Sequence, residues 1–275
     1  MTQTEPLMIA VAPNGARKSQ RDHPRLPINP QELADTAATC LDAGACMLHL
    51  HVRDSNGGHS LDAGRYHDAT AAIRHRVGDE LIIQITTESV GLYTREQQMA
   101  VVVATRPEAV SLAIREISPA GCDERSSAEF FTFLRRERIN AQYILYDEAD
   151  VSRFQDLQAR GIVSHENFSV LLVLGRYAEN QQSDPTEIAP LISGFASPPP
   201  WFLCAFGASE AACMSEAMRL GGHCRVGFEN NLLMPDGRPA SDNAELVRST
   251  SASARSLGRR IATADEARQL LGMRG

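Results

Sequence analysis

The chain lacks several features that would assign it to particular classes of protein. No apolar run reaches the roughly 20 residues that a membrane-spanning helix needs, so we expect no membrane association. The six cysteines show no CxxC spacing, and the first residues show no basic segment followed by an apolar one. Neither a thiolate metal site nor export is therefore indicated, and we predict a reducing, cytoplasmic location.

Positive charge is neither abundant nor concentrated in this sequence. The formal net charge is -7, and Lys and Arg are scattered apart from short clusters at 135–138 and 259–260. We therefore expect no nucleic-acid partner. Low-complexity tracts are also missing, and 275 residues with 43% hydrophobic content are enough to bury one large core. We predict a single domain over residues 1–275.

Short apolar runs alternate with longer segments of helical spacing along the chain. The predicted strands are residues 8–12, 45–50, 81–86, 109–113, 142–146, 169–174, 201–206 and 223–228. The predicted helices include residues 29–43, 63–76, 95–105, 126–137, 150–160, 208–220 and 243–257. In the first helix, Asn29 is the expected N-cap, Pro30 takes the first helical position and Gly44 follows the end.

Eight apolar strands separated by helices predict an α/β protein with a parallel sheet covered on both faces. A closed (β/α)8 TIM barrel is the economical assembly, and such barrels often contain about 250 residues. An open, doubly wound sheet is the alternative. It is disfavoured because no GxGxxG turn follows the first strand.

Two imidazoles alternate with apolar residues in the segment 47–54. A strand has a period of two residues, so His49 and His51 point to the same side and can bind one metal ion. Imidazole nitrogen is a good ligand for Zn²⁺. The alternative is that both rings are hydrogen-bonded in the core, and this short pattern alone does not separate the two readings.

The carboxyl ends of barrel strands meet at one face, where catalytic residues are found. Glu229 follows the predicted eighth strand, which in a closed barrel lies beside the first and one strand away from the histidine strand. Two histidines and a carboxylate around an open position are typical of a catalytic zinc site. We therefore predict a zinc ion bound by His49, His51 and Glu229.

Three segments together resemble the β-keto acid cleavage enzymes, the family that includes 3-keto-5-aminohexanoate cleavage enzyme. They are the opening loop 12–17 with its following residues 23–28, the histidine segment 49–54, and residues 225–231. The resemblance extends over nearly the whole chain. It implies a zinc-dependent barrel that cleaves a β-keto acid against acetyl-CoA, giving acetoacetate and a new CoA thioester, with the metal bound by His49, His51 and Glu229.

The resemblance also implies roles for residues around the metal. Arg225 matches the arginine that the family uses near the substrate carboxylate, and a planar guanidinium can bind a carboxylate in two places. Thr86 and Ser111 stand where the family has a serine and a threonine, so each hydroxyl is kept. Asn14 and Arg17, in the first loop, are expected to contact substrate. The simpler readings are a surface ion pair for Arg225 and strand packing for Thr86 and Ser111.

The sequence departs from the family where a base is expected. The family often follows its metal glutamate with an aspartate taken to be the base, but this chain has Asn230, and an amide cannot accept a proton at neutral pH. Glu88, Glu116 and Asp147 are alternative bases near strand ends, unless they are solvated loop acids. Glu88 is preferred because its loop lies beside the metal strand, and Asn230 is expected to assist. Arg17 stands where some relatives carry a glutamate, which indicates an anionic substrate tail.

Further expectations concern support of the site and competing functions. Arg53 and Asp54, directly after the metal strand, are predicted to support it as an ion pair. A zinc hydrolase on the same barrel is the competing enzyme class, although His59, His67, His75 and His165 are not predicted at strand ends. A metal-binding barrel without this activity is the third reading. The expected partners are a β-keto acid, acetyl-CoA and further copies of the chain, as a dimer or tetramer.

Overall fold

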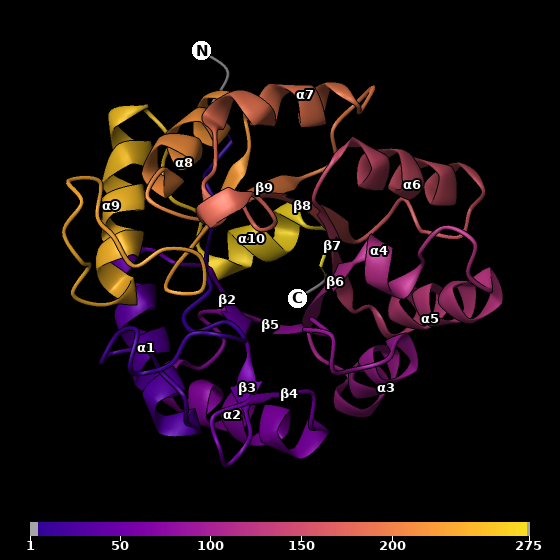
Figure 1. Ribbon diagram of the computed structural model, residues 1–275, viewed down its shortest axis with the longest axis horizontal. Helices are drawn as coiled ribbons and strands as arrows, with labels where there is room; N and C mark the ends of the chain where they lie inside the picture. Colours follow the sequence, from indigo (N-terminus) through magenta and orange to yellow (C-terminus); the bar gives the residue numbers. More distant parts are fainter. Residues whose placement is uncertain (1–4, 274–275) are drawn as a thin grey trace.

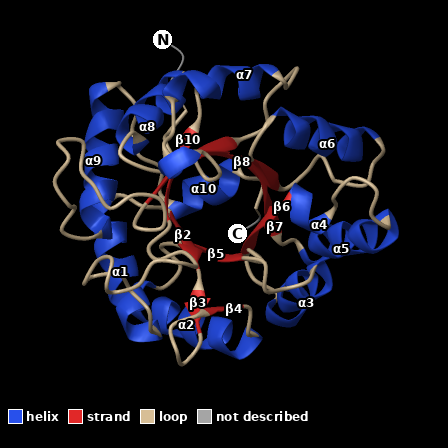
Figure 2. Ribbon diagram, viewed as in Figure 1, coloured by secondary structure: helices blue, strands red, loops and turns tan. Residues whose placement is uncertain are grey.

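The computed structural model describes residues 5–273 and contains a closed barrel of eight parallel strands. The strands follow one another around the barrel in chain order, and β1 and β10 close it by pairing with each other. Helices surround the strands on the outside (Figures 1 and 2). The predicted (β/α)8 TIM barrel is confirmed, and the open sheet is excluded.

All eight predicted barrel strands are present, with small differences at their ends. They are β1 Ile9–Val11, β2 Met47–Leu50, β5 Ile82–Thr86, β6 Ala109–Ala113, β7 Asn140–Leu145, β8 Phe168–Leu174, β9 Trp201–Ala205 and β10 His223–Val226. Both faces of the strands are covered, which explains their nearly continuous hydrophobicity.

The seven predicted helices are also present. They are α1 Pro30–Ala43, α2 Ala63–Val77, α3 Arg95–Thr105, α5 Glu124–Glu137, α6 Glu148–Ala159, α8 Glu210–Arg219 and α9 Asn243–Ser256. The Asn29 side chain accepts a hydrogen bond from the Glu32 amide, and Gly44 ends α1 in the left-handed conformation. The local signals predicted for this helix are therefore confirmed.

Several short elements were not predicted. They are the two-stranded ribbon β3 Val52–Arg53 and β4 His59–Ser60, the α-helices α4 Ile114–Ile117, α7 Ile188–Ser193 and α10 Ala264–Leu270, and the 3₁₀ turns Glu179–Gln181 and Pro185–Glu187. Such short segments give little periodicity to read. The predicted histidine segment 47–54 is thus divided, because the barrel strand ends at Leu50 and the chain then enters the ribbon.

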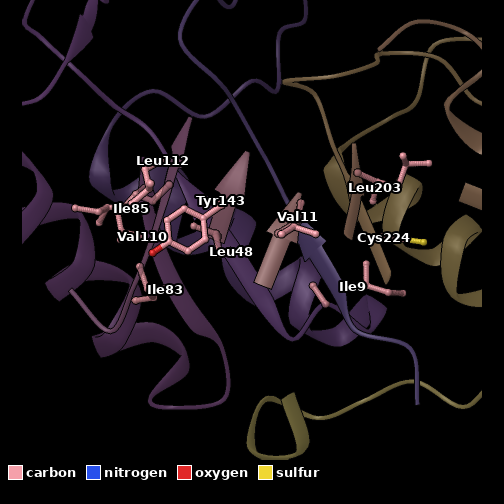
Figure 3. Packing of buried hydrophobic residues seen from close by; sticks show 14 of the residues in the cluster. Ile9, Val11, Leu48, Ile83, Ile85, Val110, Leu112, Tyr143, Leu203 and Cys224 are labelled. Atoms are coloured by element: carbon pink, nitrogen blue, oxygen red, sulfur yellow. The ribbon is translucent and has the colours of Figure 1, made fainter. Parts of the chain in front are cut away.

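The apolar residues form two clusters, one on each side of the barrel wall. The larger cluster lies between the strands and the surrounding helices and includes Val11, Leu48, Ile85 and Leu112 (Figure 3). The smaller cluster contains Met47 and Phe202 together with Leu271, which follows α10. In the view of Figure 1, α10 lies across the barrel. Among residues 5–273, no helix is long and apolar enough to cross a membrane.

Candidate metal centre and active site

The histidine strand brings two imidazoles to one point, as its alternation predicts. His49 lies in β2, His51 directly follows that strand, and both side chains are buried. Their Nε2 atoms are 3.1 Å apart. The Nδ1 atom of His49 lies 2.8 Å from Oε1 of Gln84, on the neighbouring strand β5. Because an amide oxygen can only accept, His49 carries its proton on Nδ1 and leaves the Nε2 lone pair free for a metal ion.

Glu229 completes the group from the turn after β10. Its Oε2 atom lies 3.6 Å from Nε2 of His49 and 3.6 Å from Nε2 of His51. The turn and the first loop pack tightly. Gly15 has φ +59°, and a Cβ atom there would lie 2.6 Å from Cγ of Glu229. A glycine at position 15 therefore lets Glu229 approach the histidines.

The surroundings favour the protonation states that a metal ion requires. Burial lowers the pKa of His49 to about 4 and lowers the pKa of His51 well below its usual value. Burial alone would raise the pKa of Glu229, but Arg225 and the other positive charges nearby outweigh it and lower that pKa to about 2. At neutral pH the site therefore offers two neutral imidazoles and one carboxylate, which could hold a divalent cation.

Arg225 is a buried cation beside this group. It lies in β10 with 3% of its surface exposed, and its Nη2 atom is 3.5 Å from Oε1 of Glu229 and 3.5 Å from Sγ of Cys204. Its Nε and Nη1 atoms are buried without a hydrogen-bond partner in the described part of the chain. Buried donors of this kind are normally satisfied, so the guanidinium can bind an anion in the pocket. The surface ion pair considered for Arg225 is wrong.

Glu88 and two arginines lie at the edge of the same pocket. Oε1 of Glu88 accepts from Nη1 of Arg17 at 2.8 Å and from Nη2 of Arg176 at 2.9 Å. Burial and the nearby charge of Glu229 nevertheless raise the pKa of Glu88 to about 7. Glu88 is therefore not a solvated loop acid, and both of its protonation states are accessible near neutral pH.

The three polar residues expected near substrate differ in how they are bound. Thr86 also lines the pocket, and its hydroxyl accepts a hydrogen bond from the Glu88 amide at 3.0 Å. Ser111 pairs with Thr86 across β5 and β6, and its hydroxyl has no hydrogen-bond partner within residues 5–273. Asn14 donates from Nδ2 to the His51 carbonyl at 3.1 Å, so it holds the segment directly after β2.

Asn230 is adjacent to Glu229 in sequence, but its amide points into a different set of contacts. Its Nδ2 atom donates to the Arg225 carbonyl at 3.0 Å and lies 3.4 Å from Oε1 of Glu210. Its Oδ1 atom accepts from Sγ of Cys204 at 3.2 Å. The amide is thus engaged with neighbouring protein groups, and Glu210 is a buried carboxyl that the sequence did not single out.

The predicted ion pair between Arg53 and Asp54 is wrong. The Arg53 guanidinium donates to the carbonyl oxygens of Gly15 and Lys18, at 2.6 and 2.8 Å from Nη2, and so fixes the first loop. Asp54 instead accepts from the amides of Asn56 and Gly58 in the ribbon turn. The short side chain of an aspartate beside a turn readily accepts hydrogen bonds from the backbone amides of that turn.

The other two candidate bases have structural partners. Glu116 accepts from Ser89 and from Gln98, at 2.9 and 2.6 Å. Asp147 accepts from the Asp150 amide at the start of α6 and pairs with Arg115 at 2.6 Å. Of the three candidates, Glu88 is the one that lines the same pocket as His49, His51 and Glu229.

Four further residues of the site were missed by sequence reasoning. Lys18 donates from Nζ to the Glu229 carbonyl at 2.6 Å, and His59, carried back by the ribbon, has its ring centre 5.3 Å from that of His51. Tyr146 and Arg176 line the pocket. Both follow barrel strands by one or two residues. A search for polar residues after the carboxyl ends of strands, which found Glu229, would also have found them. Lys18 and His59 carry no comparable signal.

Residues 6–273 match the family described as beta-keto acid cleavage enzyme. The chain belongs to this family. It is therefore an enzyme of the β-keto acid cleavage type, and the resemblance drawn from the three segments is confirmed.

Curated relatives resemble the chain over nearly its full length. It is 28% identical to a 3-keto-5-aminohexanoate cleavage enzyme of Acetoanaerobium sticklandii, with 98% of this chain and 99% of that protein covered. It is 26% identical to a 3-oxoadipate:acetyl-CoA acetyltransferase of Cupriavidus necator, with 98% and 96% covered. A solved ternary complex of ObcA with a C4-CoA adduct and oxalate superposes with a TM-score of 0.73 at 18% identity, covering 90% of this chain and 68% of that one. This last likeness supports the barrel fold.

Proposed function

We propose that this enzyme binds zinc and cleaves a β-keto acid against acetyl-CoA, releasing acetoacetate and a new acyl-CoA. The observation that carries the proposal is the convergence of His49, His51 and Glu229 beside the unpaired donors of Arg225. The names of two relatives, a 3-oxoadipate:acetyl-CoA acetyltransferase and a 3,5-dioxohexanoate:acetyl-CoA acetone transferase, support acetyl-CoA as the co-substrate.

The distances between the three ligand atoms fit zinc. Bonds of about 2.0–2.1 Å in tetrahedral geometry place neighbouring ligand atoms roughly 3.3 Å apart. The separations here are 3.1 and 3.6 Å. Oε2 of Glu229 is buried and has no hydrogen-bond partner among the described residues, as expected of an atom whose partner is a metal ion. Two imidazoles and a carboxylate also leave a tetrahedral ion one open position.

Bound zinc supplies Lewis-acid polarisation of a carbonyl oxygen. The chain supplies the remaining functions. Arg225 holds the substrate carboxylate through one of its unpaired donors, Nε or Nη1, together with Nη2, since each of these two pairs presents parallel N–H groups. The Ser111 hydroxyl donates to a substrate oxygen, with Thr86 beside it, and Asn14 fixes the loop after β2 through the His51 carbonyl. The apolar ring of Phe206 lines the same pocket and helps to exclude water.

Glu88 is the proposed base. Both arginines bind its Oε1 atom, which leaves Oε2 to accept the substrate proton. A pKa of about 7 suits a general base that works near neutral pH. Asn230 assists through its hydrogen bonds to neighbouring residues, since its amide is already engaged by Arg225, Cys204 and Glu210.

The pocket edge favours a β-keto acid with a second negative charge on its tail. Arg17 and Arg176 both face Glu88, so this edge carries an excess of one positive charge before substrate binds. An anionic tail would share these arginines, whereas an amine would meet repulsion. The 3-oxoadipate named for one relative has such a tail, and the aminohexanoate named for another does not.

The test is product analysis with the purified, zinc-loaded enzyme. We expect acetoacetate release that requires both acetyl-CoA and a β-keto acid, with dicarboxylic β-keto acids preferred over neutral and amino ones of equal length. Turnover without CoA would instead favour the zinc hydrolase. No turnover of a wide panel, with zinc bound, would favour a metal-binding barrel without this activity.

Two further proposals concern the assembly and its location. We propose a homo-oligomer, a dimer or tetramer, in the cytoplasm. Light scattering coupled to gel filtration would measure the first, and a monomeric mass at micromolar concentration would contradict it. Fractionation of cells with an antibody to the chain would test the second.

A further inference from the structure

Glu210 is a buried carboxyl that the proposed reaction does not use. It is the first residue of α8 and has 3% of its surface exposed. Its two oxygens face the turn that carries Glu229: Oε1 lies 3.4 Å from Nδ2 of Asn230, and Oε2 lies 3.2 Å from Nδ2 of Asn231. Burying a carboxyl is costly unless donors surround it, so these contacts are more than incidental packing.

The same contacts fix which way the Asn230 amide points. Its Nδ2 atom donates to Glu210 and to the Arg225 carbonyl, while Oδ1 accepts from Sγ of Cys204. If the amide turned over, Oδ1 would face two acceptors. Sγ of Cys204 also lies 3.5 Å from Nη2 of Arg225. A continuous set of contacts therefore connects the Glu210 carboxyl with the guanidinium in the pocket.

The backbone connects the two segments as well. The Gly207 amide donates to the Asn230 carbonyl at 3.3 Å, and the Glu210 amide donates to the Gly207 carbonyl at 3.1 Å. The loop before α8 and the turn after β10 are thus joined by main-chain and side-chain bonds. Movement of Glu210 would therefore be transmitted to the turn that holds Glu229.

We propose that Glu210 is a positioning residue of the active site. Its carboxyl fixes the turn that carries Glu229 and sets the orientation of the Asn230 amide, and through Asn230 and Cys204 it places Arg225. The inference concerns how the metal group and Arg225 are held, and it uses the proposed function for one of its readouts. It also implies that one of the two residues at positions 210 and 230 must be a carboxyl and the other an amide.

A cycle of two substitutions tests this directly. Glu210→Gln puts an amide nitrogen where a carboxyl oxygen faces the side-chain amides of Asn230 and Asn231, so we expect about tenfold weaker zinc binding and about tenfold lower kcat/KM. Asn230→Asp brings two carboxyls within hydrogen-bond distance, so we expect a larger loss and an altered pH–rate profile. In the double variant a donor and an acceptor face each other again. We expect it to be at least tenfold more active than Asn230→Asp alone.

Glu216→Gln is the matched control, because Glu216 lies on the same helix and pairs with Arg219 at the surface. It should leave zinc affinity, kcat/KM and the pH–rate profile unchanged. If Glu210→Gln fails to fold, the comparison of Asn230→Asp with the double variant still tests the inference, because only a role for Glu210 predicts that the double variant is the more active of the two. Losses that simply add in the cycle, or an unchanged zinc dissociation constant in Glu210→Gln, would overturn the inference.

Zinc affinity and urea unfolding of the same four proteins distinguish this inference from the proposed function. Should the parent enzyme release no acetoacetate, the proposed function fails, but non-additive zinc affinities in the cycle would still support the role of Glu210. Should the parent be active while the changes in the free energy of zinc binding are additive in the cycle, only the proposed role of Glu210 fails.

Discussion

The two ends of this barrel are built differently. At the carboxyl ends of the strands, Arg225, Glu229 and Ser111 keep buried polar atoms that have no partner within residues 5–273. At the opposite end, α10 and the residue after it cover an apolar interior. The charged groups there are paired: Glu108 binds Arg74 and Arg268, each at 2.6 Å.

The difference separates residues that stabilise the fold from residues that await a ligand. An unsatisfied buried polar atom costs about 1–3 kcal/mol, so a protein keeps a group of them only where something else binds. At the opposite end Oδ1 of Asn140, the first residue of β7, is an unpaired buried atom of this kind, and its amide nitrogen donates to the Leu271 carbonyl. In TIM barrels the carboxyl ends of the strands are the catalytic face, and the unpaired atoms of Arg225 and Glu229 lie side by side at that face here.

Removing a metal ligand should have the largest effect. We expect His49→Ala or Glu229→Ala to abolish stoichiometric zinc binding and to lower turnover by more than about 100-fold. Loss of a residue that only hydrogen-bonds to a metal ligand costs about 10- to 100-fold. Elemental analysis after purification without chelators measures the metal, with about one zinc per chain expected in the parent. A parent protein without any divalent metal would show that this end of the barrel holds no such site.

Gly15→Ala tests whether packing against the first loop places Glu229. The new Cβ atom would lie 2.6 Å from Cγ of Glu229, at a position with φ +59°. We expect zinc affinity to fall about 10- to 100-fold. Gly57→Ala is the control, since Gly57 also has a positive φ of +81° but no atom within 4 Å of the added Cβ. Equal losses in the two variants would mean that backbone strain, and not contact with Glu229, is responsible.

Arg225→Lys should lower kcat/KM about tenfold or more while zinc content stays at the parent level. A lysine keeps the charge but loses the paired donors that match a carboxylate. Kinetics with the preferred β-keto acid measure the effect. Parent-like values would remove Arg225 from substrate binding, and the unpaired donors at this end would need another explanation.

Glu88→Gln should change the dependence of activity on pH. The pKa of Glu88 is raised to about 7, and a base must be deprotonated, so kcat/KM of the parent should rise as pH increases through about 7. The variant should lose this rise of kcat/KM with pH and retain little activity at any pH. A variant with the same rise of kcat/KM with pH and the same maximal kcat/KM as the parent would show that another residue is the base.

The smallest effect is expected at the paired end. Glu108→Gln weakens the contacts with Arg74, which is partly exposed, and with Arg268, which is nearly buried, and should lower the free energy of unfolding by about 1 kcal/mol. Zinc content and kcat/KM should not change. Urea denaturation measures the stability, and a loss of zinc in this variant would contradict the separation of the two ends.

Much of the fold and part of the site could be predicted from the sequence, because the signals were local. Strand and helix periods gave all eight barrel strands and seven helices, and the caps of α1 followed from Asn29, Pro30 and Gly44. The alternation of His49 and His51 required only the period of a strand. The position of Glu229 after the last strand required only that the barrel close.

The remaining parts of the site depend on contacts between segments far apart in the chain. Lys18 reaches the Glu229 carbonyl, and Arg53 binds carbonyls of the first loop and not its neighbour Asp54. Glu210 and Asn230 lie 20 residues apart and meet only because the loop before α8 joins the turn after β10. Long side chains choose partners by three-dimensional proximity, which sequence spacing does not encode.

The sequence by itself therefore determined the barrel, its order of elements and the three residues that converge at the candidate metal site, since each follows from a short-range period or from strand ends meeting at one face. The tertiary structure alone decided which carboxyl lies in the pocket, which donors remain unpaired and how the Asn230 amide is turned. These depend on burial and on the exact approach of loops, and both arise only when the barrel has closed.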